Sequence, residues 1–262
     1  MRLAPTEHVL LLNMHHIISD GWSVGVFIHE LTSLYQSYVQ GEPSPLPALP
    51  LQYADFAYWQ RHYLSEDVLA PHLAYWKDQL AGAPQLLQLP LDRSRPAVQT
   101  FHGANAHFVV DATLTGKLIA QSRKAGMTLY TSMFSAYATL LYRLSGQEDF
   151  IIAVPVANRT QSELEPLIGF FVNELPIRVN LSGDPTFSEL RRRVHATLLD
   201  GFAHQDAPFE KIVEDFAPVR SLSQQTPLAQ VVFVLQNASK GRLTLPDLQV
   251  TPLAVTSTTA KY

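Results

Sequence analysis

The sequence contains no cysteine, which excludes a disulfide framework and any metal site built on thiolates. It has no apolar run approaching the roughly 18 to 20 residues of a membrane span, and residues 1–8 lack the regions of a signal peptide. The formal net charge is -4 and there is no basic stripe, so nothing indicates nucleic-acid binding. We therefore expect a cytoplasmic protein with no membrane and no nucleic acid among its partners.

Hydrophobic residues make up 47% of the 262 residues, enough for one large domain or two lobes with sizeable cores. Helical spacing of apolar residues predicts helices at 23–40, 51–64, 67–81, 113–125, 128–144, 186–203 and 208–216. Mostly apolar stretches predict strands at 9–14, 103–110, 149–155, 168–180 and 228–236. No internal repeat accompanies this mixture, which favours an α/β (α+β) protein with mixed sheets covered by helices.

Two proline-containing stretches interrupt the helical pattern. The stretch 41–50 holds four prolines and is predicted to be an extended connection that follows a helix stop at Gly41. The stretch 83–100 holds three prolines and scattered charges, and is the best candidate for a linker between lobes. The predicted domains are therefore 1–82 and 101–262.

A short polar motif follows the apolar run at 9–12, and it carries most of the chemical information. His15 and His16 precede Asp20 and Gly21 at the predicted start of a helix. A neutral imidazole accepts a proton near neutral pH, so one of the two rings is a candidate base. Adjacent residues of an extended chain point to opposite sides, so we expect one ring to face a cleft and the other to pack or hydrogen-bond inside.

Other interpretations of the pair stay open on these residues alone. Adjacent rings diverge and no second cluster supplies further ligands, which argues against a metal site. Two satisfied core histidines are the simpler alternative. A serine hydrolase would need a nucleophile, and the chain has no G-x-S-x-G.

Five sequence motifs in a fixed order resemble the condensation domains of nonribosomal peptide synthetases, whose signature is His-His, three residues, Asp-Gly. They are MHHIISDGWS at 14–23, YADFAYW at 53–59, IGFFVNELPIR at 168–178, HQDAPFE at 204–210 and RSLSQQTPL at 220–228, followed by QVVFVLQN. The resemblance implies a two-lobed fold like chloramphenicol acetyltransferase, with a reaction tunnel between the lobes.

The resemblance also implies a reaction and its partners. The enzyme would be an acyltransferase that joins a carrier-bound donor acyl or peptidyl thioester to the amine of a carrier-bound aminoacyl acceptor. Its partners would be donor and acceptor peptidyl carrier domains and neighbouring adenylation domains of the same synthetase. No cofactor or metal would be bound directly, because the phosphopantetheine arms of the carrier domains deliver the substrates.

The resemblance assigns roles around the motif. His16 would be catalytic, either removing a proton from the amine or orienting it, with proximity supplying much of the rate. His15 and Asp20 would support the site, and Arg159 is the predicted ion-pair partner of Asp20, with Arg178 as second choice. Gly21 would keep the tunnel open and offer its N–H to the thioester oxygen.

Four further residues are expected to line the tunnel, namely Trp22, Ser23, Asn173 and Asn237. The aromatic residues of YADFAYW have helical spacing and are more simply explained as core. The HQDAPFE region is expected to supply helix caps and hydrogen bonds.

The chain departs from the family pattern at both ends, because family members carry a long segment before the His-His motif and run on after residue 262. The resemblance thus implies a fragment, with the first lobe incomplete and the second truncated, whose strand at 9–14 would have an unpaired edge. We expect the isolated fragment to be inactive or poorly soluble. The tryptophan after Asp-Gly favours the type that joins an L donor to an L acceptor. The alternatives are an epimerization domain and a non-catalytic relative that recruits partner enzymes.

Overall fold

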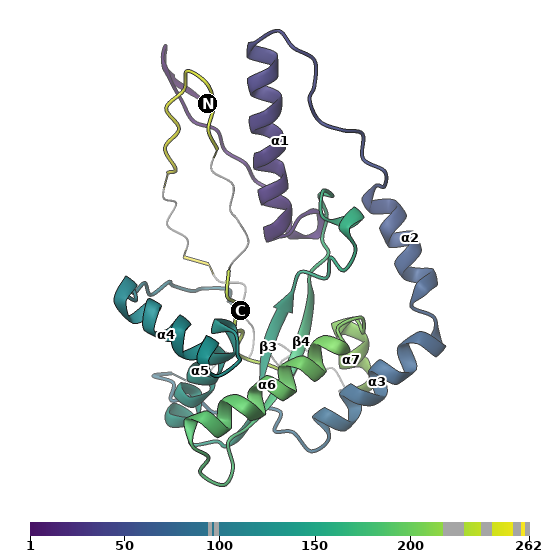
Figure 1. Cartoon of the computed structure of the whole chain (residues 1–262), viewed down its shortest axis with the longest axis vertical. Helices are drawn as coiled ribbons and strands as arrows, with labels where there is room; N and C mark the ends of the chain where they lie inside the picture. Colours follow the sequence, from purple (N-terminus) through teal and green to yellow (C-terminus); the bar gives the residue numbers. More distant parts are fainter. Residues whose placement is uncertain (94–95, 97–99, 217–227, 237–242, 254–257, 260–262) are drawn as a thin grey trace. The chain divides into compact units, whose positions relative to one another are not determined.

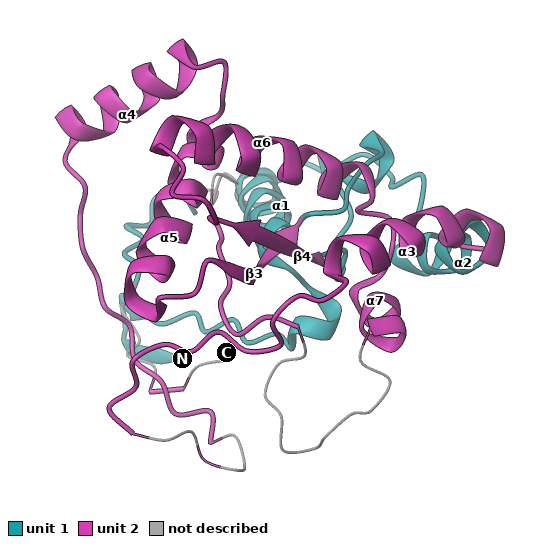
Figure 2. Cartoon of the chain, turned by 90° about the horizontal axis from the view of Figure 1, so that it is seen from below, with its two compact units in different colours: residues 1–63, 157–172, 237–252 teal, residues 64–156, 173–236, 253–262 magenta. Residues whose placement is uncertain are grey.

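The computed structural model describes residues 1–93, 96, 100–216, 228–236, 243–253 and 258–259 (Figure 1). The chain divides into two compact units (Figure 2). Unit 1 comprises 1–63, 157–172 and 237–252, and unit 2 comprises 64–156, 173–236 and 253–262. The predicted lobe boundary at 83–100 stays a prediction, although Ala83 and Leu87 within that range are buried in the core of unit 2.

In its described residues, unit 1 contains two short strands, two 3₁₀ turns and two helices. The strands β1 (Arg2–Ala4) and β2 (Glu7–His8) pair antiparallel. The turns are His16–Ile18 and Ser162–Leu164, and the helices are α1 (Gly21–Val39) and α2 (Tyr53–Tyr63). Asp20 caps α1, because its carboxylate accepts the Ser23 N–H. Gly41 has a φ of 75° just after α1, which confirms the predicted stop.

The predicted strand at 9–14 does not form. The chain is irregular there, and Leu10 and Leu11 keep 71% and 73% of their surface exposed. A strand needs a neighbour that takes up its N–H and C=O groups, and among the described residues β1 and β2 pair only with each other. The apolar run is therefore an exposed segment that leads into the histidine turn.

Where it is described, unit 2 contains five helices and a pair of long strands. The helices are α3 (Glu66–Leu80), α4 (Ala112–Lys124), α5 (Leu129–Ser145), α6 (Phe187–Ala203) and α7 (Phe209–Phe216). The strands β3 (Asp149–Val156) and β4 (Asn173–Asn180) pair antiparallel over their full length. The helix α6 packs on β4 and α5, and α7 packs on α3. Two predicted helix starts, Thr128 before α5 and Pro208 before α7, lie at the expected places.

Three further strand predictions are wrong in whole or in part. The stretch 103–110 forms no strand, because the adjacent His102 makes only an isolated bridge to Thr259. Phe108 and Val109 are 87% and 93% exposed. The stretch 228–236 meets β3 at a single parallel bridge between Ala153 and Val232. The strand predicted at 168–180 begins only at Asn173, because the preceding residues bind the start of α1.

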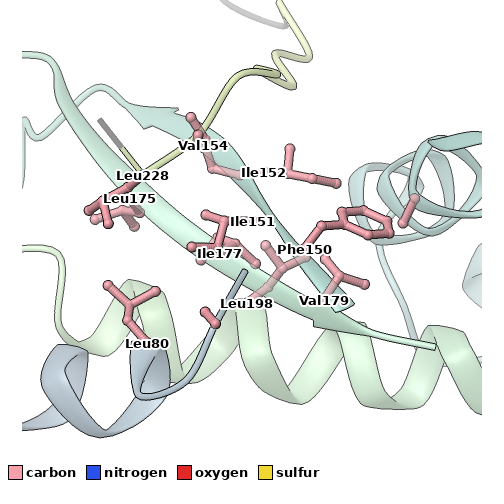
Figure 3. Packing of buried hydrophobic residues seen from close by; sticks show 14 of the residues in the cluster. Leu80, Phe150, Ile151, Ile152, Val154, Leu175, Ile177, Val179, Leu198 and Leu228 are labelled. Atoms are coloured by element: carbon pink, nitrogen blue, oxygen red, sulfur yellow. The ribbon is translucent and has the colours of Figure 1, made fainter. Parts of the chain in front are cut away.

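The core of unit 2 lies between the strand pair and the helices that cover it (Figure 3). The strands supply apolar side chains from both rows of the pleat, with Ile152, Leu175 and Ile177 in one row and Ile151 and Ala153 in the other. Trp76 and Phe134 contribute the largest buried side chains from α3 and α5. The burial of β3 on both faces explains its nearly continuous apolar sequence. No helix of the described residues is both long and apolar enough to cross a membrane.

Two histidines join α3 to the end of α6. His72 Nδ1 lies 3.1 Å from His204 Nδ1, and Tyr75 stacks on the His204 ring with centroids 4.0 Å apart. The His204 carbonyl accepts the Trp76 indole N–H at 3.1 Å, as expected for a capping role. One Nδ1 must donate and the other accept, so the pair does not tolerate a proton on both atoms. Burial, followed by the neighbouring His72, lowers the pKa of His204, and Asp200 only partly opposes this.

The free energy of unfolding should therefore depend on pH through this pair. Because the pKa of His204 is lowered on folding, the unfolded chain binds the proton more readily below the ordinary value of about 6.5. Stability is expected to fall from pH 7.5 to 5.5 more steeply in the wild type than in His204→Gln, as measured by urea denaturation. His62→Gln, which changes an exposed histidine of α2, should follow the wild type. Parallel curves for wild type and His204→Gln would contradict the prediction.

Candidate functional site

The histidine turn holds two imidazoles by different nitrogen contacts. The His15 Nδ1 accepts the backbone N–H of Ile17 at 3.0 Å and so caps the 3₁₀ turn. The His16 Nδ1 lies 2.6 Å from the carbonyl oxygen of Ser19. A carbonyl only accepts, so His16 Nδ1 carries the proton, and the neutral ring has its lone pair on Nε2. In His15, Nδ1 is the acceptor, so the two neighbours are opposite tautomers.

Both rings are exposed within unit 1, which corrects the expectation that one of them packs inside. Residues 16–18 form a turn rather than a strand, so the alternation of side chains along an extended chain does not apply. The His15 ring stabilises the turn through its contact with Ile17, while Nε2 of the exposed His16 ring stays accessible. The expectation of two satisfied core histidines is also excluded by this exposure.

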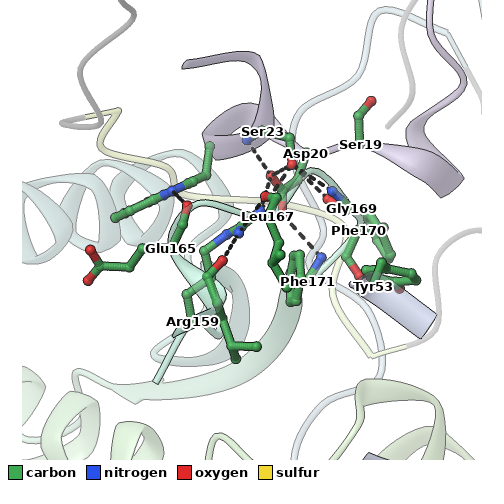
Figure 4. A network of polar contacts seen from close by, with 12 residues as sticks. Ser19, Asp20, Ser23, Tyr53, Arg159, Glu165, Leu167, Gly169, Phe170 and Phe171 are labelled. Carbon is green, nitrogen blue, oxygen red and sulfur yellow. Dashed lines mark hydrogen bonds and ion pairs between the residues drawn. The ribbon is translucent and has the colours of Figure 1, made fainter. Parts of the chain in front are cut away.

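The buried centre of the site is the carboxylate of Asp20 (Figure 4). Its Oδ1 accepts the N–H and the hydroxyl of Ser23, both at 2.8 Å, and its Oδ2 accepts the N–H of Phe171 at 3.1 Å. The Arg159 guanidinium lies 3.3 Å from Oδ1. The Asp20 and Arg159 side chains are 0% and 1% exposed, so this is a fully buried ion pair. The predicted partner is therefore confirmed.

Arg159 also binds the loop that follows it. Its Nη1 donates to the carbonyls of Leu164 and Leu167, and its Nη2 donates to the Ser23 hydroxyl at 3.0 Å. The guanidinium carbon lies 4.0 Å from the centre of the Phe171 ring. Burial lowers the pKa of Arg159, and the charge of Asp20 opposes that shift. Arg178, the second choice, pairs with Asp149 in unit 2 instead.

The residues around Asp20 mostly have structural partners. Trp22 donates its indole N–H to the Glu165 carbonyl at 2.9 Å and is 37% exposed. Ser23 is fully buried, and its hydroxyl donates within the Asp20 cluster. Gly21 is the first residue of α1, and a Cβ atom there would meet nothing within 4 Å.

The two asparagines of the predicted tunnel lining differ. The Asn173 side chain donates to the carbonyls of Gln205 and Ala207 at 2.7 and 2.8 Å, and accepts the N–H of Phe209 at 3.0 Å. This confirms that a polar side chain inside the apolar run has partners, and that HQDAPFE supplies structural hydrogen bonds. Asn237 lies outside the described residues, as does most of the motif at 220–228.

The sequence interpretation missed the role of the three residues at 169–171. The Gly169 N–H donates to the Ser23 hydroxyl oxygen at 3.0 Å, and the Gly169 carbonyl lies 2.8 Å from the same oxygen. Tyr53 donates its hydroxyl to the Phe170 carbonyl at 2.8 Å. The sequence pattern predicted a strand at 168–180 and a core position for Tyr53 on a helix. The glycine inside IGFF was the only sequence feature that indicated a close approach of the backbone.

Tyr53 begins α2 and packs in a small core of its own. Its ring lies edge-on to Phe171, with centroids 5.2 Å apart, and Phe56 and Leu167 belong to the same buried cluster. Burial, with a smaller contribution from Asp20, raises the pKa of Tyr53, which therefore stays a neutral donor. In the part of the chain that is described, no group of three or more His, Asp or Glu side chains is arranged to hold a metal ion.

Comparisons with known proteins show the family of the chain. The family model for the Condensation domain matches residues 1–262. The chain is 51% identical over 237 residues, or 90% of its length, to a linear gramicidin synthase of Brevibacillus parabrevis, of which it spans 5%. The X-domain from teicoplanin biosynthesis is similar in structure, with a TM-score of 0.80, 31% identity, and coverage of 93% of this chain and 56% of that one.

A second solved structure contains that X-domain in complex with OxyB, with a TM-score of 0.76 and 32% identity, over 92% of this chain and 54% of that one. These likenesses confirm the fold class predicted from the motifs, with mixed helices and small sheets of the chloramphenicol acetyltransferase-like kind. The chain spans a small part of the length of its curated relatives and about half of the structural ones.

Proposed function

We propose that this chain, which belongs to the condensation domain family, catalyses amide bond formation between a carrier-bound donor acyl or peptidyl thioester and the amine of a carrier-bound aminoacyl acceptor. The observation that carries the proposal is the His16 ring, exposed at the surface of unit 1 with its Nδ1 proton bound to Ser19. This contact leaves Nε2 as the nitrogen that can receive a proton from an amine or hold it by a hydrogen bond.

In the proposed reaction, the acceptor amine attacks the donor thioester carbon. The C–N bond forms, the C–S bond breaks, and the proton lost by the amine passes by way of His16 Nε2 to the departing thiolate of the donor arm. Gly21 lies at the positive end of α1, where N–H groups have no partner within the helix, and we assign it the developing oxyanion. His15, Asp20 and Arg159 hold the loop that presents these groups.

The substrates imply the partners. Donor and acceptor peptidyl carrier domains would present thioesters on phosphopantetheine arms, and adenylation domains of the same synthetase would load them. We retain the L donor to L acceptor type, which rests on Trp22 following Asp-Gly. Trp22, Ser23, Asn173 and Asn237 remain proposed contacts of the tunnel, although the buried hydroxyl of Ser23 supports a structural role instead.

Partner recruitment without catalysis is the second candidate, and the likeness to an X-domain that is solved with OxyB favours it. Catalysis is supported by the intact His-His-x-x-x-Asp-Gly motif and by the hydrogen bond from His16 Nδ1 to Ser19, which leaves Nε2 as the acceptor. Epimerization, the remaining alternative, would keep the same motif but change the stereochemistry of a tethered residue.

The test uses the full synthetase that contains this chain, with donor and acceptor carriers loaded with defined aminoacyl groups. We expect a dipeptidyl thioester on the acceptor carrier, with the L configuration retained at both residues. An epimerized donor without a new amide would favour epimerization. Absence of product with loaded carriers, together with capture of a partner enzyme, would replace catalysis by recruitment.

A further inference from the structure

The His16 ring is also contacted by a residue that lies outside the His-His-x-x-x-Asp-Gly motif. The Phe170 ring meets the His16 ring edge to face, with centroids 5.2 Å apart and an interplanar angle of 86°. The hydrogen bond to Ser19 holds Nδ1, and a rotation of the exposed ring about the Cβ–Cγ bond would break it. A second contact on the ring opposes that rotation, since aromatic rings at this distance and angle attract each other.

Phe170 is suited to this task because its own backbone is held at both neighbours. The Gly169 N–H donates to the Ser23 hydroxyl oxygen, and the Phe171 N–H donates to Asp20. The carbonyl of Phe170 itself accepts the Tyr53 hydroxyl. Three successive residues are thus fixed to the starts of α1 and α2 (Figure 4).

The close approach of Tyr53 depends on the absence of a side chain at Gly169. A Cβ atom at that position would overlap the Tyr53 ring and would come within 2.9 Å of the Phe171 ring. The Tyr53 hydroxyl therefore reaches the Phe170 carbonyl only because residue 169 has no side chain. The order Gly-Phe-Phe has a distinct reason at each position: close approach, contact with His16, and contact with Arg159.

We propose that Phe170 is a positioning residue for His16, and that Tyr53 acts through Phe170 by holding its backbone. Their role is to keep His16 in the tautomer that carries its proton on Nδ1 and exposes Nε2 as acceptor. This inference rests on the proposed function, because the ring position matters for the reaction only if His16 takes part in it.

The first test needs no activity. In the chain labelled with ¹⁵N-histidine, the His16 nitrogen shifts at alkaline pH should show Nδ1 protonated and Nε2 free. Phe170→Ala is expected to lose this single-tautomer signature, and Phe170→Tyr, which keeps a ring, to restore it. Tyr53→Phe should give an intermediate loss. Phe108→Ala, which removes an 87% exposed ring, is the matched control and should leave the His16 shifts unchanged.

The second test measures the reaction in the full synthetase. Phe170→Ala should lower kcat about tenfold or more with little change in KM, since misplacement of a reacting group costs rate rather than affinity. Unchanged His16 shifts in a folded Phe170→Ala protein would overturn the inference, whatever the rate. A wild-type chain with the expected shifts and a synthetase that forms no amide would overturn the proposed function and leave the positioning of His16 standing.

Discussion

Replacement of His16 by alanine is expected to lower the rate of amide formation by about 10² to 10⁴, the range typical of a positioned general acid or base. The loss follows from the absence of Nε2, the nitrogen that the Ser19 contact leaves without a proton. The ring is exposed, so the free energy of unfolding should change by no more than about 1 kcal/mol. The rate is measured as dipeptidyl product in the full synthetase, with carriers loaded in advance.

The matched control is His62→Ala. His62 is exposed on α2 in the same unit, and its Nδ1 lies 2.7 Å from the Tyr58 carbonyl, as His16 Nδ1 lies beside that of Ser19. The control removes a histidine with the same type of contact but outside the motif, and should keep the wild-type rate. A His16→Ala enzyme that forms product at the rate of this control would remove His16 from the chemistry.

The helices could be predicted from sequence and the strands only in part. Periodicity of apolar residues reports a property of one segment, so the helices lie close to their expected bounds. A strand depends on a neighbour that sequence does not identify. The segments at 9–14 and 103–110 have apolar residues but form no ladder with a second strand, whereas Asp149–Val156 has Asn173–Asn180 beside it.

The candidate site, too, could be predicted from the sequence only in part. The resemblance to a family indicated the Asp20 and Arg159 pair, although 139 residues separate them. The acceptor of the His16 proton is the carbonyl of Ser19, and a backbone atom leaves no mark on a side-chain pattern. Tyr53 and Phe170 meet through a hydroxyl and a carbonyl, so neither motif alone predicted the contact. Sequence thus identified the charged groups and missed the backbone groups that orient them.

Among the described residues, the buried ion pair of Asp20 and Arg159 is expected to contribute more to stability than any exposed ion pair. Both side chains are buried, and the guanidinium also satisfies the carbonyls of Leu164 and Leu167. Without it, the carboxylate would keep three donors but no opposite charge, and two carbonyls would lose their partner. Breaking such a pair from one side typically costs about 3 to 5 kcal/mol.

Arg159→Met should accordingly lower the free energy of unfolding by about 3 to 5 kcal/mol, measured by urea denaturation with tryptophan fluorescence, since Trp22 and Trp59 lie in unit 1. Arg193→Met is the control, because Arg193 and Glu189 are 39% and 41% exposed and their pair contributes at most about 0.5 kcal/mol. Adding Asp20→Asn to Arg159→Met should recover part of the loss, because the unpaired charge is then absent. A loss below about 1 kcal/mol in Arg159→Met, or a further loss in the double variant, would show that the hydrogen bonds to Asp20 suffice without the charge.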